Sequence, residues 1–524
     1  MLPAIWHRYI FLFGLIGLAA GMLFGTVPTS IPQIILAANW LLEKDFAWKW
    51  QQLKSNKLFW ILISFFILHV LGMIYTQNIP KGLDDLRNKM PLLTLPLILF
   101  TTKPLDSKEF KLLFNFFFLG VLVSSISCFL VYKGFTKKVI VDVRQASVFM
   151  SHIRFSLFIA FTIIALLFFI INETKFIYKI MRGVAIIWLL FFMYKLEMAT
   201  GILCLVATSI LLLVIISAKK LPKKLSLAFV ISIGVIGVFI ISKAISSLNM
   251  FEENKSNSAN VLLEKTKSGK HYYHDTLFNV AENGNLIFVN ICETELRTEW
   301  PTKSSLHLDD LDKKGNTTYY TLMRYLASKG LNKDSIGISK LNTDDVKNIE
   351  RGNTNYKYDI NSGLAYKWRE LVWEYTSFKR NRNPSGHTLT MRLEFWKTAT
   401  YIIKQNLLVG VGTGDVQDAF NQAYVETNSL LDMKWRLRSH NQYLAIGVAF
   451  GLIGLVVFIV YLMLPAFLLR DKLQYLYWPF LIIAMLSFIT EDTLETQSGV
   501  SFFIFFQALF LWLASFQPKT QALK

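Results

Sequence analysis

A short polar segment directly before a long apolar run carries the side chains best suited to chemistry. It reads Arg436-Leu-Arg-Ser-His-Asn-Gln-Tyr-Leu, and the apolar residues continue to Leu469. His440 titrates near neutral pH, and an imidazole at the mouth of a membrane-spanning helix is a functional candidate by default. Because Tyr443 follows three residues later, a helix that begins here carries both side chains on one face. An interfacial histidine that only caps the helix fits the position equally well.

Arginines form the second group of candidates, because a guanidinium group binds phosphate through two hydrogen bonds and stays charged at any relevant pH. Arg392 and Trp396 lie at i and i+4 on a predicted helix and therefore share a face. A surface ion pair is the more frequent role for such an arginine. Arg154 stands at the outer end of an apolar segment, where it faces the bundle or a cavity, or extends to the membrane interface. Arg438 precedes His440 and can reach the same boundary.

Acidic residues lie at the outer mouth between the last two apolar segments, at Glu491, Asp492 and Glu495. They could orient a base, accept hydrogen bonds from a sugar, or be solvated. We expect solvation for Asp492 and leave the role of Glu491 open.

A glycine-rich stretch, Gly410-Val-Gly-Thr-Gly-Asp, resembles a nucleotide-binding loop. A helix is predicted before it, however, where a dinucleotide-binding fingerprint needs a strand. We therefore expect a tight turn between helices, although amides at the start of the next helix could hold an anion. No further ligand residues accompany His271 and His274, so the sequence predicts no metal site and no cofactor.

The composition indicates a membrane protein. Of the 524 residues, 53% are hydrophobic, and the mean hydropathy is +0.40. The formal charge of +19 fits the bias of lysine and arginine toward cytoplasmic loops. Nucleic-acid binding is the weaker explanation, because no basic block alternates with stacking aromatic residues in a soluble domain. The cysteines Cys128, Cys204 and Cys292 are far apart and imply no disulfide framework.

Runs of apolar residues predict an all-α polytopic membrane protein with about twelve transmembrane helices. The predicted segments are residues 10–23, 31–42, 59–74, 90–100, 112–131, 155–171, 184–194, 198–216, 227–241, 443–469, 473–489 and 500–516. They divide the chain into an N-terminal bundle (1–245), a large loop (246–438) and C-terminal transmembrane helices (439–524). Basic residues in alternate loops place both termini in the cytoplasm and the large loop outside. Two loops predicted to lie outside are basic and break this pattern, one of them with Lys81, Arg87 and Lys89. These residues could bind an external anionic ligand, or they reflect ordinary scatter in the distribution of charges.

The large loop is expected to contain a small α+β insertion. A strand is predicted over 285–292, and helices over 319–328 and 342–350, the latter with Thr343 as N-cap. Three more helices follow over 365–378, 389–405 and 415–425.

The ordered motifs resemble those of the O-antigen ligase family of bacterial membrane glycosyltransferases, in particular its Bacteroidetes-type members. The motifs are Arg392-Leu-Glu-Phe-Trp-Lys, Leu408-Val-Gly-Val-Gly-Thr-Gly-Asp, Ser439-His-Asn-Gln-Tyr-Leu and Gly451-Leu-Ile-Gly, with Ser151-His-Ile-Arg-Phe-Ser-Leu, Arg324-Tyr-Leu-Ala-Ser-Lys-Gly and Ile349-Glu-Arg-Gly for those members. The resemblance implies a helical bundle of the GT-C-like kind in the bacterial inner membrane. It also implies transfer of a glycan from undecaprenyl pyrophosphate to an acceptor on the periplasmic side, without a metal.

In ligases of this family the acceptor is the lipid A–core oligosaccharide. The resemblance makes His440 the base that deprotonates the acceptor hydroxyl and Arg392 a ligand of the pyrophosphate. Many members carry another arginine where this chain reads Glu197-Met-Ala-Thr-Gly-Ile. Arg154 and Arg438 are the candidates for that second cationic role, and Tyr443 is a further candidate for substrate binding.

Several functions remain open at this level. A polymerase of the same donor chemistry and a protein O-oligosaccharyltransferase differ from a ligase only in the acceptor. A transporter or flippase would need charged residues deep inside the apolar segments, and few are present.

Overall fold

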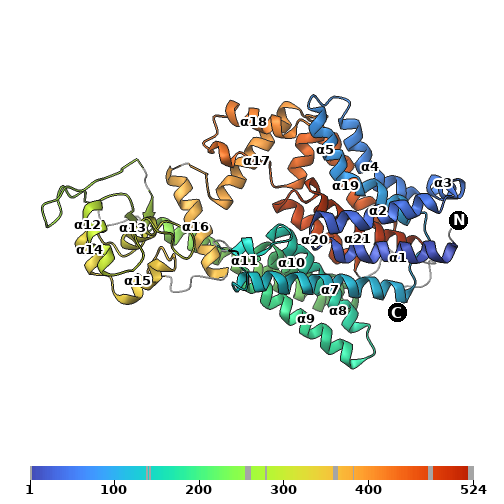
Figure 1. The fold of residues 1–524 in the computed structure, drawn as a ribbon, viewed down its shortest axis with the longest axis horizontal. Coiled ribbons are helices and arrows are strands. Elements are labelled where there is room, and N and C mark those ends of the chain that lie inside the picture. Colours follow the sequence, from blue (N-terminus) through green and yellow to red (C-terminus); the bar gives the residue numbers. More distant parts are fainter. Residues whose placement is uncertain are drawn as a thin grey trace.

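The computed structural model describes residues 3–136, 138, 140, 143–253, 261–277, 280–357, 364–381, 383–469 and 476–516 (Figure 1). Within these residues the regular elements are helices and one small antiparallel sheet, so the predicted all-α class is confirmed. Figure 1 shows a large helical bundle and a smaller lobe, which α16 connects.

Each predicted apolar segment coincides with one helix, although residues 473–475 of one segment lie outside the described part. The helices are α1 (Ala4–Gly21), α2 (Thr26–Leu42), α4 (Lys57–Gly72), α6 (Pro91–Leu99), α7 (Ser107–Tyr132), α8 (His152–Ile171), α9 (Phe176–Lys195), α10 (Ala199–Lys220), α11 (Lys223–Glu253), α19 (Gln442–Leu468), α20 (Tyr477–Thr490) and α21 (Gln497–Ser515). Two polar helices, α3 (Phe46–Ser55) and α5 (Ile79–Lys89), flank α4.

Seven of the described helices are long and apolar enough to cross a membrane: α1, α7, α8, α9, α10, α19 and α21. The pair α3 and α4, bent by 90°, would make an eighth if it counted as one span. The chain is therefore a multi-pass membrane protein, and the larger number of about twelve stays a prediction. Two prolines lie in one short segment, Pro91 at the start of α6 and Pro96 inside it, where its missing amide removes one helical hydrogen bond.

Helix α21 forms the centre of the bundle. Phe502, Phe506 and Phe510 contact aromatic rings of neighbouring helices, including Phe161 of α8 and Phe480 of α20. A helix that is apolar on all sides is stable only when other helices enclose it. The segments on either side of α21 are thus held in place by a packed aromatic core.

The smaller lobe has its own hydrophobic core, separate from that of the bundle, with Trp300 and Leu326 fully buried in it. It contains β1 (Ala281–Glu282), β2 (Asn285–Leu286), α12 (Glu293–Glu299), α13 (Thr318–Ser328), α14 (Ser335–Ser339) and α15 (Thr343–Glu350). The predicted α+β character is present, but the predicted strand over 285–292 is wrong in length. Beyond Leu286, only two isolated bridges extend it within the described residues, from Ile291 to Tyr273 and to Lys333. The N-cap of α15 is Asn342, not Thr343, because the Asn342 side chain accepts a hydrogen bond from the Asp345 amide.

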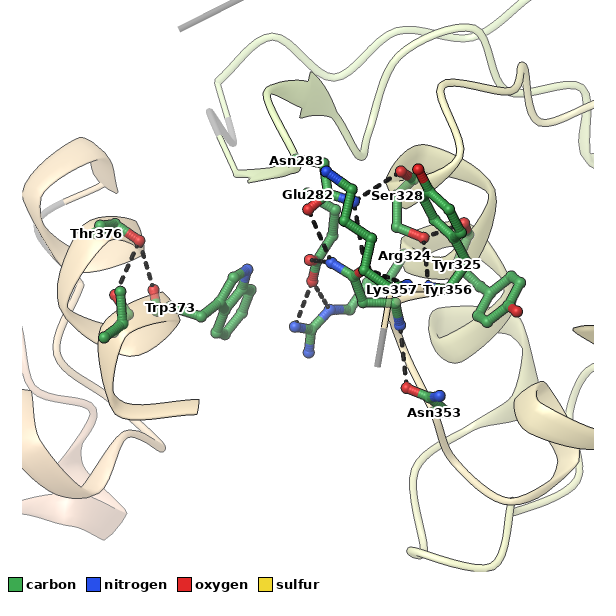
Figure 2. Close-up of polar contacts among 12 residues, drawn as sticks. Glu282, Asn283, Arg324, Tyr325, Ser328, Asn353, Tyr356, Lys357, Trp373 and Thr376 are labelled. Atoms are coloured by element: carbon green, nitrogen blue, oxygen red, sulfur yellow. Dashed lines mark hydrogen bonds and ion pairs between the residues drawn. The ribbon is translucent and has the colours of Figure 1, made fainter. Parts of the chain in front are cut away.

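Helix α16 (Leu364–Asn381) joins the lobe to the bundle. Figure 2 shows the junction, where Arg324 of α13 donates two hydrogen bonds to Glu282 Oε1, at 2.8 and 2.5 Å. The Arg324 guanidinium also stacks 3.8 Å from the ring centre of Trp373 on α16. Helices α17 (Thr388–Gln405) and α18 (Val416–Glu426) follow, and their apolar residues, such as Phe395 and Phe420, belong to the bundle core.

The two glycine motifs meet backbone to backbone. Helix α19 breaks at Gly451, which has φ 62° and ψ −156°. Loop residues 407–412 pair with the broken turn: the Leu452 amide donates to Leu407 O at 2.9 Å, and the Val411 amide donates to Val448 O at 3.0 Å. A Cβ on Gly451 would lie 2.4 Å from the Leu408 carbonyl carbon, so only glycine permits this approach. The loop thereby satisfies backbone groups that a broken membrane helix would leave unpaired.

Candidate active site

His440 lies outside helix α19. Asn441 caps that helix, since its Oδ1 accepts a hydrogen bond from the Leu444 amide at 3.0 Å. The predicted helix that would carry His440 and Tyr443 on one face is therefore wrong, because the cap places the first helical residue at Gln442. His440 adopts the left-handed conformation with φ 46°, which is uncommon for a residue other than glycine. Such a conformation persists only where surrounding contacts hold it.

The contacts that hold His440 come from α17 and α20. Trp396 Nε1 donates to Ser439 O at 3.1 Å, and the ring of Phe395 lies 5.7 Å from the imidazole ring. Asn441 Nδ2 donates to Ile489 O at 3.0 Å near the end of α20. The carbonyl group before the histidine and the side chain after it are thus both hydrogen-bonded, which fixes the backbone at His440.

Gln442 fixes the beginning of α19 against the α20–α21 connector, and Tyr443 fixes it against α20. Gln442 Oε1 accepts a hydrogen bond from the Leu494 amide at 2.7 Å, and its Nε2 donates to Glu495 Oε1 at 2.9 Å. The Tyr443 hydroxyl donates to Met485 O at 3.1 Å. The structure thus engages Tyr443 in helix packing and does not place its hydroxyl beside His440.

Two carboxylates of the connector face the histidine. His440 Nδ1 lies 3.6 Å from Asp492 Oδ1, and Glu491 Oε1 lies 3.3 Å from Arg154 Nη2. Both carboxylate residues are buried, with 8% of Asp492 and 5% of Glu491 exposed. The predicted solvation of Asp492 is therefore wrong, because the end of α20 turns this side chain toward the imidazole.

Arg392 lies close enough to the same carboxylates for its charge to act on them. It is partly buried, one turn before Trp396 on α17, and its charge acts on Glu491, Asp492 and His440. Within the described part of the chain, its guanidinium group has no hydrogen-bond or ion-pair partner. A half-buried guanidinium without a protein partner is suited to binding an anion.

Arg438 occupies a different place from the other candidates. Its Nε donates to Gln417 Oε1 at 3.3 Å, and its Nη1 lies 3.8 Å from Glu495 Oε2. The structure therefore brings His440, Arg392 and Arg154 together around Glu491 and Asp492. Arg438 is tied to α18 and to the other end of the connector.

Residues 360–459 match the family model described as O-antigen ligase. The chain carries an O-antigen ligase domain. The domain includes Arg392, the glycine-rich loop, Arg438 and His440, and its family implies transfer of a glycan in general. No curated protein matches the chain. Arg154, Glu491 and Asp492 lie outside the matched segment, so bundle helices contribute part of the candidate site.

The close approach of His440, Glu491, Asp492 and the two arginines determines the electrostatics of the candidate site. The polar contact with Asp492 raises the pKa of His440, while burial and the charge of Arg392 oppose the rise. Burial and the charge of Asp492 raise the pKa of Glu491, against the pull of Arg154 and His440. A histidine with a raised pKa and an oriented Nδ1 is a stronger base at its other nitrogen, Nε2.

A cation is less suited to this site than an anion. Ligand atoms of His440, Glu491 and Asp492 all lie within 4.8 Å of one another, which would allow metal binding. The guanidinium groups of Arg154 and Arg392 act on the same carboxylates, however, and repel a second positive charge. The donor set of the ligase domain and its neighbours therefore favours a negatively charged ligand.

The glycine-rich loop of the ligase domain is a turn, as expected, and its amides are occupied. The Gly410 amide donates to Asn406 O, the Gly412 amide to Ala449 O, and the Gly414 amide to Thr76 Oγ1. The Asp415 carboxylate accepts hydrogen bonds from the amides of Gln77 and Asn78 instead of capping α18. These internal bonds leave the loop amides no capacity for an anion.

The sequence analysis missed the structural role of Gln442 and Glu495. Gln442 is fully buried and bonds both to the connector backbone and to Glu495. A signal was present, because a polar residue in the first turn of an apolar helix needs a partner. The partner could not be identified, since it comes from a connector beyond two helices of the chain.

Proposed function

We propose that this protein transfers a glycan from undecaprenyl pyrophosphate to an acceptor hydroxyl on the periplasmic side of the bacterial inner membrane. The proposed acceptor is the lipid A–core oligosaccharide. The observation that carries the proposal is that the imidazole of His440, beside Asp492, meets the guanidinium of Arg392, which has no hydrogen-bond or ion-pair partner among the described residues. A base and an anion-binding group beside each other fit transfer from a diphosphate to a hydroxyl.

The proposed mechanism needs two separate contributions from the protein. His440 Nε2 takes the proton of the acceptor hydroxyl. The oxygen of that hydroxyl forms a bond to the anomeric carbon of the glycan. The bond from that carbon to the diphosphate oxygen breaks, and the electron pair leaves with undecaprenyl diphosphate. Asp492 stabilises the imidazolium that forms, and Arg392 stabilises the growing negative charge on the leaving group.

The placement at helix ends supports chemistry at a membrane surface. His440 precedes α19, Glu491 and Asp492 follow α20, and Arg154 lies in the first turn of α8. A lipid-linked donor presents its diphosphate at such a boundary. A transporter would instead be expected to carry ionisable groups near the middle of its spans.

The test is transfer in vesicles reconstituted with the lipid-linked donor and purified candidate acceptors. We expect His440→Gln to lower kcat by about 10²–10⁴-fold, the usual contribution of a general base. His307→Gln, at an exposed histidine of the lobe, is the matched control and should transfer normally. Transfer by His440→Gln at the rate of this control would reject the proposal.

The acceptor is tested by deletion of the gene in its native host. Loss of all capped lipopolysaccharide would support a ligase with lipid A–core as acceptor. Capping with single repeat units would indicate a polymerase, and loss of glycoproteins would indicate a protein O-oligosaccharyltransferase.

A further inference from the structure

A buried lysine lies behind the candidate active site. Lys89, the last residue of α5, is 0% exposed. Its Nζ lies 2.7 Å from Asp85 Oδ1 and 3.0 Å from Glu495 Oε2, so one ammonium group pairs with two carboxylates. Removing one partner from such a buried pair leaves a charge uncompensated and is strongly destabilising locally. The position of Glu495 is therefore tightly determined by Lys89.

Glu495 is hydrogen-bonded to the segments that carry His440 and Asp492, the proposed catalytic pair. Its Oε1 accepts a hydrogen bond from Gln442 Nε2 at 2.9 Å, and Gln442 follows His440 by two residues. Its backbone amide donates to Asp492 O at 3.0 Å, within the short turn of the connector. Glu495 therefore contacts the backbone of Asp492 directly and contacts His440 through Gln442.

The charges around Glu495 support this role. Despite burial, the charges of Lys89 and Arg438 keep the pKa of Glu495 below its usual range. Lys89, Arg438, Asp85 and Glu495 together form a balanced group of two cations and two carboxylates. The expectation that Lys89 serves an external anionic ligand is wrong, because its ammonium is enclosed and already paired.

We propose that Lys89 is a positioning residue for the His440–Asp492 pair, acting through Glu495. Lys89 touches no substrate. It fixes the Glu495 carboxylate, which holds the first turn of α19 through Gln442 and holds Asp492 through the connector turn. The inference deepens the proposed function and rests on it.

The experiment compares four full-length proteins in the same reconstituted transfer assay: wild type, Lys89→Met, Glu495→Gln and Lys89→Met/Glu495→Gln. Lys89→Met keeps the length of the side chain but removes its charge. We expect kcat to fall about tenfold or more while KM for the donor changes less than about twofold, because ground-state binding does not involve Lys89. The acid limb of the pH profile should also move to lower pH, because a displaced Asp492 no longer raises the pKa of His440.

The matched control is Lys111→Met, at an exposed lysine of α7, which should leave kcat and the pH profile unchanged. The double variant tests the route. If Lys89 acts only through Glu495, Lys89→Met should lower kcat by less than about twofold in the Glu495→Gln background. A further large loss in that background would overturn the inference, and this comparison also decides the matter if Lys89→Met alone fails to insert.

The two proposals fail in different ways. If His440→Gln transfers glycan normally, the proposed function fails. If His440→Gln is inactive but Lys89→Met keeps the wild-type kcat and pH profile, only the positioning role of Lys89 fails.

Discussion

The contact between His440 and Asp492 makes a quantitative prediction for Asp492→Asn. At 3.6 Å, two unit charges interact by about 1 kcal/mol in a medium like water and about 5 kcal/mol at an effective dielectric constant of 20. The imidazole side chain is 34% exposed, so solvent screens the contact and the lower part of that range applies. Losing about 1.4 kcal/mol of interaction with the charged imidazolium lowers its pKa by about one unit.

We therefore expect Asp492→Asn to lower the pKa of His440 by about one pH unit. The sign follows from the role of a base, which works only when it is neutral. Activity is lost as pH falls through the pKa of His440, so the acid limb of the kcat/KM profile should move to lower pH. The imidazolium of the transition state loses the same stabilisation, which should lower kcat about tenfold at the optimum.

The measurement is initial transfer rate in vesicles between pH 5 and 9, with the donor saturating and then limiting. Asp432→Asn, at an exposed carboxylate outside the cluster, is the matched control and should reproduce the wild-type profile. An Asp492→Asn protein with an unmoved acid limb and an unchanged kcat would refute the electrostatic reasoning.

Three further outcomes are expected. Arg392→Lys should raise KM for the donor about tenfold, measured by donor saturation, because lysine cannot make a two-point contact with a diphosphate; an unchanged KM would contradict this. Gly451→Ala should lower the melting temperature in detergent far more than Gly183→Ala, since only the former forces a Cβ against the backbone; equal stability of the two variants would count against the interpretation. Arg324→Gln should leave Glu282 buried without its cation and cost about 3–5 kcal/mol, seen as faster proteolytic release of the lobe than in Arg297→Gln, and equal rates would reject it.

Local patterns were sufficient to predict the helices. Apolar runs report burial or membrane contact over one segment, and each predicted segment coincided with one helix of the structure. The candidates His440, Arg392 and Arg154 were also found locally, from the cost of placing charged groups at a membrane boundary. Their meeting around Glu491 and Asp492 depends on how α8, α17 and α20 pack, which no local pattern encodes.

Errors arose where a partner distant in the chain decides the outcome. Asp492 is polar and lies in a connector, so solvation was the natural expectation, yet the end of α20 points it at His440. Lys89 looked like an exception to the charge rule for loops, yet its partner Glu495 lies more than 400 residues away, with |i−j| of 406. At Asn441 a local signal existed, because asparagine is a strong N-cap, and the helix was nevertheless predicted to begin too early.

The break in α19 has a consequence for chimeras between related proteins. The backbone groups left free at the break are hydrogen-bonded to the loop of residues 407–412 that precedes α19. Neither the loop nor the broken helix therefore has a complete set of backbone hydrogen bonds without the other. Because the loop precedes α19 in the chain, it is synthesised before the second half of the helix that it pairs with. Exchanging 406–453 as a single block should preserve this fit, whereas a crossover between the two glycine motifs would join halves that were never selected together.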